Sequence, residues 1–404
     1  MSDNVNNKVI PPAIEESGVK ARIITPDDGG HYFFGYYDLQ PFDSTGRYHL
    51  CHKAPFEDRL PEADDICELG VIDLQTGKFI KYAETNAWNF QQGTLLQWYK
   101  DDDHIIYNVR DNGTYKTCIK NIRTGETRLL PMAFANLSQD CTKALCLNFS
   151  RIYDFRPGYG YAGIKDPFFE DKAPVEDGVF LMDTETGEVK QILTMTALRD
   201  AYFNSEFSNG KLLVNHINFN PSANRFAMLF RNFRDPSAPS WRTQLLTADI
   251  DGNIFEMSPW GFHSHYHWKN DEQLLIFSAY DINERQDGLW LFTDKTDKAE
   301  KLPEPNPKKD VHCLYSPNRR YIMGDGYPDA DGYRWLHFID SKTNTDTILG
   351  KYKSYINTNK DVDYRCDLHA RFDQTGRYVS FDSIHTGKRT ICIIDLSTLE
   401  GYEY

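Results

Sequence analysis

The stretch Ser316-Pro317-Asn318-Arg319-Arg320-Tyr321-Ile322-Met323 decides the fold of this chain, because a turn sequence runs directly into an apolar strand pattern. A second turn sequence, Asp340-Ser341-Lys342-Thr343-Asn344, follows further along. Asx and Gly turns between runs of alternating apolar residues are hairpin signals. Each such pair of turns therefore predicts a four-stranded antiparallel unit.

This pair of turns recurs along the whole chain. First-turn sequences occupy residues 42–46, 99–103, 138–142, 220–224, 269–272, 316–320 and 372–376. Second-turn sequences occupy residues 73–77, 121–125, 183–187, 249–252, 294–297, 340–344 and 395–398. Seven four-stranded antiparallel units in one chain predict an all-β fold, a seven-bladed β-propeller.

The two ends of the chain complement each other. The last repeat stops after the strand 391–395 and has no room for a full outer strand, whereas residues 20–24 precede the first inner strand and are otherwise spare. We expect this N-terminal segment to supply the outer strand of the last blade, which closes the ring and covers the sheet edges. Residues 1–404 then form one domain without linkers, with residues 1–19 as a flexible segment.

Composition excludes several classes of protein. The net charge of −14 argues against nucleic-acid binding, and no run of 18 apolar residues could span a bilayer. Residues 1–30 are polar and contain Pro11, Pro12, Glu15 and Glu16, unlike a signal peptide. We expect a cytoplasmic protein, or a periplasmic or secreted one if a leader was removed. The eight cysteines contain no CxxC pair, which predicts free buried thiols.

Propeller geometry brings residues from every blade to one face. Residues just before each innermost strand and just after the next strand share one rim, whereas the opposite face receives the turns. Long segments such as 53–68 and 151–177 make the repeats longer than the ~40–45 residues of compact blades. Long loops on one rim predict a canyon for a ligand rather than a flat docking surface.

Polar side chains are concentrated on this rim. Amides at the start of a strand suit sugar hydroxyls but also cap unpaired backbone, and a lone arginine is commonly a solvated charge. The convergence of these side chains on one rim favours ligand binding in an otherwise acidic protein. Candidates for substrate contact are Trp88, Asn89, Gln91, Gln92, Asn148, His216, Arg231 and Arg234.

A group of histidines begins the inner strands of three consecutive blades, around the central channel: His263, His265, His312 and His369, together with Asp367. Imidazoles at i and i+2 of a strand face the same way, so a metal site with N and O ligands is geometrically feasible. Cys313 and Cys366 lie beside it and could supply a thiolate. The alternative is a polar channel of hydrogen-bonded histidines. We expect a divalent metal (zinc, manganese or calcium) in a structural rather than a catalytic role.

Short motifs in the last three blades resemble the oligogalacturonate lyases, which are propeller polysaccharide lyases. Val311-His312-Cys313-Leu314 and Gly324-Asp325-Gly326 look like their Ser-His-Leu and Gly-Asp-Gly segments, and Asp367-Leu368-His369-Ala370 looks like their His-Pro-His-Pro segment. In that family, histidines and a glutamine hold a metal, which implies a metal at His312 and His369. Asp367 replaces a histidine here, and Tyr364 stands roughly where the glutamine would be.

In the amino-terminal half, the pair His31 and His52, with Tyr and Arg from the next blades, looks more like the His and Tyr sites of the ulvan lyases. Propeller enzymes that act on rhamnose linked to glucuronate share this fold, and some were described as rhamnosidases. The resemblance implies an acidic glycan or oligosaccharide as substrate. At the level of the fold the resemblance covers essentially the whole chain, whereas at the level of the chemistry it rests on short motifs.

A uronate lyase must neutralise the C6 carboxylate, remove the C5 proton and protonate the O4 leaving group. Rim residues of the right types are His31 and His52 as base or acid, Tyr37 or Tyr159 as phenolic partner, and Arg110 and Arg151 as carboxylate neutralisers. The sequence thus predicts a lyase that cleaves a uronic-acid-containing glycan by β-elimination.

Two alternatives stay open. A glycoside hydrolase on the same fold would need a pair of carboxyl groups, and Asp38, Asp111 and Asp154 lie near the rim. A propeller without catalytic activity would present its face to a protein or glycan partner, with an exposed apolar patch.

Overall fold

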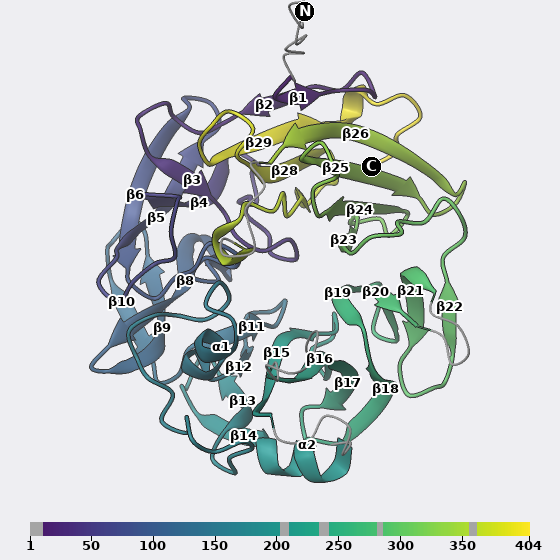
Figure 1. Ribbon diagram of the computed structural model, residues 1–404. Coiled ribbons are helices and arrows are strands. Elements are labelled where there is room, and N and C mark those ends of the chain that lie inside the picture. The colour runs from purple at the N-terminus through teal and green to yellow at the C-terminus, as the bar shows by residue number, and fades with distance from the viewer. Residues whose placement is uncertain (1–10, 203–209, 234–241, 281–285, 355–361) are drawn as a thin grey trace, which may run out of the picture.

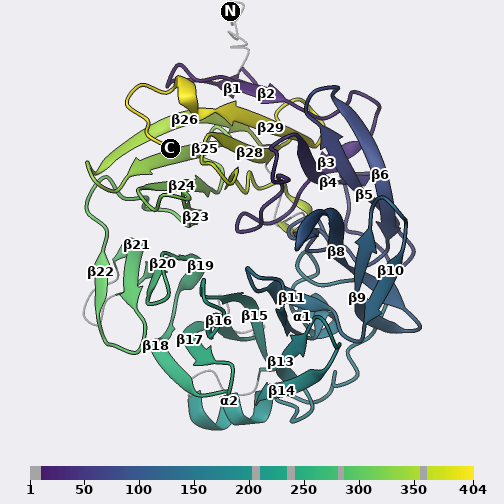
Figure 2. The same cartoon turned by 180° about the vertical axis from the view of Figure 1, so that it is seen from behind.

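The computed structural model describes residues 11–202, 210–233, 242–280, 286–354 and 362–404. Seven antiparallel sheets of these residues stand around a central axis (Figures 1 and 2). Successive strands of each blade run from the axis outward. The predicted all-β, seven-bladed β-propeller is confirmed.

Blades 1 to 4 each consist of four consecutive strands. Blade 1 comprises β3 (His31–Phe33), β4 (Tyr48–Ala54), β5 (Cys67–Asp73) and β6 (Lys78–Thr85). Blade 2 comprises β7 (Gln97–Tyr99), β8 (Asp101–Asp111), β9 (Thr114–Asn121) and β10 (Thr127–Leu130). Blade 3 comprises β11 (Phe134–Leu137), β12 (Lys143–Cys146), β13 (Gly178–Asp183) and β14 (Val189–Thr194). Blade 4 comprises β15 (Leu212–Phe219), β16 (Arg225–Asn232), β17 (Thr243–Asp249) and β18 (Ile254–Gly261).

Blades 6 and 7 each borrow a strand from the N-terminal segment, whereas blade 5 does not. Blade 5 comprises β19 (His263–Trp268), β20 (Gln273–Ala279), β21 (Asp287–Thr293) and β22 (Ala299–Lys301). Blade 6 comprises β23 (Val311–Tyr315), β24 (Tyr321–Gly326), β25 (Tyr333–Asp340), β26 (Thr345–Lys353) and β1 (Ala13–Ile14). Blade 7 comprises β27 (Arg371–Phe372), β28 (Tyr378–Ser383), β29 (Thr390–Asp395) and β2 (Ala21–Ile23).

The repeated turn sequences have a common chemistry. In blade 1 the Asp43 carboxylate accepts a hydrogen bond from the Tyr48 amide at 2.7 Å, and Arg47 pairs at 2.8 Å with Asp73, which opens the second turn. The first turn is thereby tied to the second. The same contacts recur in blades 6 and 7, with Ser316, Tyr321, Arg320 and Asp340, and with Asp373, Tyr378, Arg377 and Asp395.

The N-terminal segment closes the ring, as predicted. β2 pairs with β29, with Ala21 opposite Ile394 (Figure 1). Of the segment 1–19, which was expected to be flexible, residues 1–10 lie outside the described residues, and Ala13–Ile14 form β1, with Ala13 opposite Tyr352 of β26. The reason is that the long β26 offers an outer edge, and the Lys353 amide donates to the Pro12 carbonyl at 2.9 Å.

Packing between blades buries apolar side chains throughout the ring. All eight cysteines are buried and free, which confirms the prediction of unpaired thiols. None of the helices in the described part of the chain is long and apolar enough to cross a membrane.

Two α-helices lie in the connections of blade 3. Helix α1 (Phe149–Phe155) follows β12, and helix α2 (Met195–Tyr202) follows β14. Asn148 is the N-cap of α1, since its side-chain oxygen accepts hydrogen bonds from the amides of Ser150 and Arg151. After α1 the chain turns back toward the propeller axis, and this return places Tyr159 beside the channel.

Candidate active site

Aromatic and imidazole rings from five blades meet at the centre of the propeller. Tyr36 and Tyr37 follow β3, and His216, His265, His312 and His369 come from blades 4 to 7. We call these six residues the channel cluster. The ring centroids of His265 and His312 are 3.9 Å apart, those of His312 and His369 are 4.3 Å apart, and Tyr36 is 4.9 Å from His216. The cluster therefore connects blade 1 with blades 4, 5, 6 and 7.

Irregular backbone aims these histidines at the channel. The pairing of β15 with β16 skips His216, which is the extra residue of a β-bulge, and its φ is 51°. A second bulge lies in β19 between His263 and Tyr266, and His369 has a φ of 43° just before β27. Histidine tolerates this left-handed region better than most residues. Bulges commonly re-aim a side chain beside an active site.

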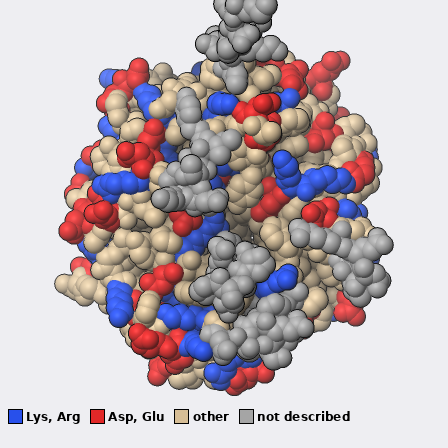
Figure 3. Space-filling model, viewed as in Figure 1, with Lys and Arg blue, Asp and Glu red and all other residues tan. Residues whose placement is uncertain are grey.

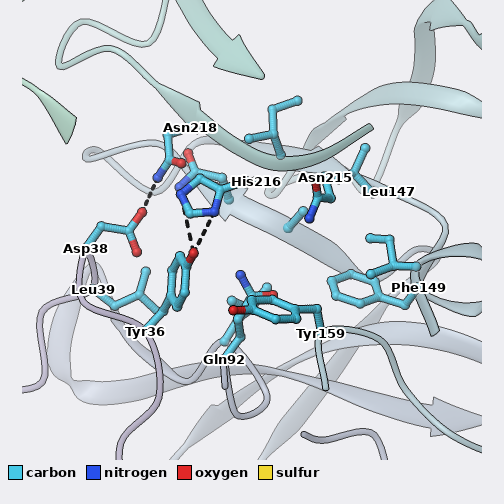
Figure 4. A pocket seen from close by; sticks show the side chains of 15 residues that line it. Tyr36, Asp38, Leu39, Gln92, Leu147, Phe149, Tyr159, Asn215, His216 and Asn218 are labelled. Carbon is cyan, nitrogen blue, oxygen red and sulfur yellow. Dashed lines mark hydrogen bonds between the residues drawn. The ribbon is translucent and has the colours of Figure 1, made fainter. Parts of the chain in front are cut away.

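Tyr36 and His216 form a hydrogen-bonded pair with a defined direction (Figure 4). Tyr37 Oη lies 2.8 Å from the Tyr266 carbonyl, to which it donates, and 2.9 Å from the Tyr266 amide, from which it accepts. His216 Nε2, at 3.1 Å from Tyr37 Oη, is therefore the donor to that oxygen. His216 Nδ1 is left with a lone pair, which accepts the Tyr36 hydroxyl at 2.6 Å.

The electrostatics of the pair keep both groups neutral. Burial raises the pKa of Tyr36 well above its usual value, with nearby Tyr159 acting in the same direction. Burial lowers the pKa of His216 well below its usual value, and the neighbouring His265 adds to this effect. Nδ1 of a neutral His216 therefore accepts the Tyr36 hydrogen bond, and both shifts keep the proton on Tyr36 in the absence of a ligand.

His312 and His369 face each other through their Nε2 atoms at 3.2 Å. His369 Nδ1 lies 2.8 Å from the Gly35 carbonyl and donates to it, and His312 Nδ1 lies 3.2 Å from the Asp325 carboxylate. With the Nδ1 atoms protonated, two unprotonated nitrogens face each other and repel unless a cation lies between them. Metal-binding histidines have this pattern of outer hydrogen bonds.

Asp367 completes a group of three metal-ligand atoms that lie within 4.8 Å of one another. Its Oδ2 is 3.9 Å from His369 Nε2. Arg334 and Arg365 also pair with this carboxylate, at 2.7 and 2.8 Å, and against the effect of burial they hold the pKa of Asp367 well below its usual value. Two imidazoles and a carboxylate suit a divalent transition metal, but here the carboxylate is shared with two guanidinium groups.

Arg231 lies close to the channel cluster and has few partners among the described residues. Arg231 on β16 is only 8% exposed, its Nε has no hydrogen-bond partner, and it forms no ion pair with any carboxylate that the structure describes. Burial, together with the neighbouring Arg156, lowers the pKa of Arg231 to about 10. A buried cation without a partner is costly. An anionic ligand would remove this cost.

Tyr159 is held beside Arg231 by two further arginines. Its hydroxyl accepts a hydrogen bond from Arg365 at 3.2 Å, and Arg156 stacks over its ring at 4.6 Å. Arg365 also donates to the Tyr327 hydroxyl at 3.4 Å.

Lys and Arg side chains border the hollow at the centre of this face, although the protein as a whole is acidic (Figure 3).

A pocket opens beside the Tyr36–His216 pair (Figure 4). One wall is apolar and includes Leu147, Phe149 and Ile152. The polar lining consists of Tyr36, Asp38, Gln92, Asn136, Tyr159, Asn215, His216 and Asn218. An apolar wall with converging polar groups is one feature of small-molecule sites, and the free space among these side chains is about 20 Å³, room for about one water molecule.

The structure brings about half of the predicted site residues together. Tyr37, Tyr159, His216 and Gln92 lie in the channel cluster or at the pocket, and Arg231 lies near Tyr36 and Tyr159. Of the predicted metal ligands, His312, Asp367 and His369 form one group, and His265 stacks on His312. His263 lies apart, because the bulge in β19 breaks the i, i+2 relationship, and its ring nitrogens contact Ser278 and the Pro259 carbonyl.

The predicted acid–base histidines and carboxylate-binding arginines are not at this site. His31 pairs with Glu57 at 3.0 Å at the far end of β3. His52 is buried between blades 1 and 2, where its Nε2 contacts Thr94 at 3.0 Å. Arg110 contacts Asp64 at 3.4 Å. Arg151 is buried, pairs with Asp166 at 3.0 Å, and donates to carbonyls such as that of Leu212, so it supports the loop of blade 3.

Several predicted sugar contacts serve the fold. Trp88 packs in an apolar cluster with Phe33 and Phe90, and Tyr364 packs against the same cluster. Asn89 donates to the Gly160 carbonyl at 3.2 Å and Gln91 donates to the Arg365 carbonyl at 2.9 Å, so both amides hold the loops that bear site residues. Asn148 caps α1, and Arg234 lies outside the described residues.

Sequence reasoning assigned no role in the lyase site to Tyr36, Arg156 or Arg365. Tyr36 adjoins the predicted Tyr37, and Arg365 precedes Asp367 by two residues, so proximity in sequence was the available signal. Asp38 was considered only for a hydrolase. Arg156 carries no sequence signal of its own, because only the return of the chain after α1 brings it to Tyr159.

Solved structures with the same fold include oligogalacturonate lyases. The enzyme from Vibrio parahaemolyticus has 15% sequence identity and a TM-score of 0.68, with 97% of each chain covered. An oligogalacturonate lyase in complex with manganese has 16% identity and a TM-score of 0.68, with 96% of each chain covered. The β-propeller domain of the trilobed protease from Pyrococcus furiosus has 12% identity and a TM-score of 0.50, covering 92% of this chain and 96% of that one.

No protein-family model matches the sequence, and no curated protein matches it. The resemblance to oligogalacturonate lyases is confirmed at the level of the fold. At these identities the comparisons establish the seven-bladed propeller, and the chemistry has to be argued from the site itself.

Proposed function

We propose that this protein is a polysaccharide or oligosaccharide lyase that cleaves a uronic-acid-containing glycan by β-elimination. The observation that carries the proposal is Arg231, a buried guanidinium without an anionic partner among the described residues, beside a neutral Tyr–His pair. A uronate supplies the missing anion through its C6 carboxylate. It also supplies an acidified proton at C5, next to that carboxylate.

Binding of the carboxylate is the first task of the site. Arg231 binds it, and Arg156, which lies near Arg231 and stacks on Tyr159, is itself paired with Asp363 at 3.0 Å. Negative charge grows on the carboxylate as C5 loses its proton. Fixed positive charges in a site that excludes water stabilise that change more than they stabilise the ground state.

Proton removal is the second task. Tyr36 Oη accepts the C5 proton while its own proton moves to His216 Nδ1, 2.6 Å away. The electron pair of the C5–H bond forms the C4–C5 double bond, and the C4–O4 bond breaks. Tyr37 assists by accepting the hydrogen bond from His216 Nε2, which fixes the ring in the required tautomer.

His312, His369 and Asp367 are the residues that would hold a divalent metal. The facing Nε2 atoms and their outer hydrogen bonds fit such an ion, and a structural neighbour was solved with manganese. When bound, the metal would add positive charge beside the substrate carboxylate. Linking blades 6 and 7 through these ligands would also stabilise the ring, which is the structural role expected from the sequence.

The glycoside hydrolase alternative has less support from the site. Hydrolysis of a glycoside needs two carboxyl groups on opposite sides of the bond, and Asp38 is the only carboxyl residue among the described residues that line the pocket. Some structural neighbours are propellers of peptidases, but that likeness is one of fold.

The test is a panel of acidic oligosaccharides, assayed in parallel for ultraviolet absorbance and for new reducing ends. β-Elimination yields a 4,5-unsaturated uronate, so both signals should rise together, and the carboxyl-reduced form of the same glycan should give neither. New reducing ends without absorbance would replace the lyase with a hydrolase. Neither signal on any uronate, with glycan binding retained, would favour the partner-binding alternative.

A further inference from the structure

Asp38 is a pocket carboxyl group with few partners. It directly follows Tyr37, and its side chain lines the same pocket as Tyr36, His216 and Tyr159 (Figure 4). The Asn218 side-chain amide donates to it, as does its own backbone amide. It forms no ion pair with any described residue.

Asp38 is half-buried, and four fully buried carboxylates of this chain have a partner that it lacks. Asp166, Asp294, Asp367 and Asp382 each pair with an arginine. Asp177 is also buried without an arginine partner, so the lack of an ion pair does not by itself mark a site. Asp38 differs from Asp177 in lining the pocket, where a ligand would reach it.

The surroundings of Asp38 favour its protonated form. Burial raises the pKa of Asp38 to about 6, although Asn218 and the more distant Arg371 and His312 oppose the rise. The other titratable groups near it are Tyr36, Tyr37 and Tyr266, whose own pKa values lie above the usual range. A carboxyl group that titrates near neutral pH inside a pocket can serve as a general acid.

The proposed elimination leaves one requirement unmet. When the C4–O4 bond breaks, its electron pair stays on O4, and a sugar alkoxide is a poor leaving group unless it receives a proton. The Tyr36 hydroxyl already donates to His216 Nδ1, so its proton is directed away from the substrate. A second proton carrier in the same pocket would meet this need.

We propose that Asp38 is the general acid of this site, which donates its carboxyl proton to the departing O4 atom. This inference rests on the proposed function. Asp38 gives one proton to O4 while the Tyr36–His216 pair takes one proton from C5. After product release the pair loses that proton to solvent and Asp38 regains one, so no co-reactant is required. Asn218 positions the carboxyl group through its amide.

The experiment compares two uronates that differ only in the group on O4. One carries a sugar and needs a proton to leave, whereas the other carries a nitrophenyl group, whose oxygen leaves as a stable anion. Asp38→Asn should lower kcat on the sugar-bearing substrate by ~10²–10⁴-fold. Its kcat on the nitrophenyl substrate should stay within a few-fold of wild type.

Asp177→Asn is the matched control. Asp177 is also a buried aspartate whose pKa is raised by burial, and its side-chain partner is likewise an asparagine amide, that of Asn148 at 3.0 Å, but it does not line the pocket. This variant should act like wild type on both substrates. Equal losses for Asp38→Asn on both substrates, or full activity on the sugar-bearing one, would overturn the assignment.

A measurement on the wild type covers the case in which Asp38→Asn does not fold. Its kcat on the sugar-bearing substrate should fall as pH rises above about 6, as Asp38 loses its proton, and this limb should be absent with the nitrophenyl substrate. The same limb on both substrates would refute the acid role. A wild type that makes no unsaturated uronate from either substrate would refute the proposed function and this inference together, whereas an active wild type with an active Asp38→Asn refutes this inference alone.

Discussion

His216 Nδ1 accepts the hydroxyl of Tyr36 at 2.6 Å, across the propeller axis and 180 residues along the chain. Tyr37 accepts from the opposite nitrogen of the same ring, so one imidazole joins two consecutive tyrosines. This relationship gives His216 a single tautomer and leaves Tyr36 Oη as the atom that can receive a proton.

Loss of the Tyr36–His216 pair should abolish proton transfer without unfolding the protein. Tyr36→Phe and His216→Asn are each expected to lower kcat by ~10²–10⁴-fold, the usual contribution of a positioned acid–base group. Asn is the choice at position 216 because it tolerates the φ of 51° found there.

Tyr107→Phe is the control for removing a buried hydroxyl, since Tyr107 is buried in blade 2 away from the channel. Solvent-deuterium incorporation at C5 of recovered substrate reports proton removal directly. Undiminished exchange in Tyr36→Phe would exclude Tyr36 as the proton acceptor.

Arg231 is predicted to destabilise the folded protein while it contributes to the binding of the uronate. Arg231→Met should leave the melting temperature unchanged or raise it, because a buried cation without a counterion is replaced by an apolar side chain of similar length. The same change should raise KM for uronates and should remove the preference for a free carboxylate over its methyl ester. A marked fall in melting temperature would mean that Arg231 has a structural partner.

A metal at His312, His369 and Asp367 should be detectable without any activity assay. Protein purified without added metal is expected to contain a divalent ion in stoichiometric amount, and chelation should lower the melting temperature because the ion binds the native state. His312→Ala should lose the ion and the effect of chelator. Elemental analysis that finds no ion, before and after dialysis against manganese or zinc, would leave the two imidazoles as a hydrogen-bonded pair.

Stability should decline in mild acid because of buried neutral histidines. Burial lowers the pKa of both His49 and His52 to about 3, far below the value near 6.5 of an unfolded chain. The unfolded state therefore binds more protons below pH 6.5, and stability is complete above that pH and falls as pH decreases toward the folded-state value.

Each such histidine should contribute on the order of 2 kcal/mol to the loss between pH 6.5 and pH 5. Denaturant unfolding as a function of pH measures this slope. His52→Gln should make the curve shallower by about one proton per molecule, and an unchanged slope would mean that His52 does not stay neutral in the fold.

The N-terminal strands should differ in their importance for ring closure. Deletion of residues 1–19 removes β1 from blade 6, which still keeps four strands, and should cost little stability. Deletion of residues 1–25 also removes β2, exposes the edge of β29 and should lower the melting temperature much further. Equal melting temperatures for the two deletions would contradict the closure of the ring by β2.

The sequence alone determined the architecture of this protein. Turn residues such as Asp43 and Ser316 act on the backbone of their own hairpins, and strand alternation is a local pattern, so seven repeats and the closing strand at 20–24 could be predicted. His312 and His369 could also be predicted, because both sit at the start of an inner strand and every inner strand points along the axis.

Only the tertiary structure decided which polar residues share the site. The bulge at His216 shifts a single residue out of register, and the return of the chain after α1 brings Tyr159 to Tyr36; neither event has a local sequence signature. Arg151 and Arg231 look alike in sequence, yet Asp166 neutralises the first, and no described carboxylate forms an ion pair with the second. Whether an ionisable group serves the fold or the chemistry depends on its partners, which only the tertiary structure selects.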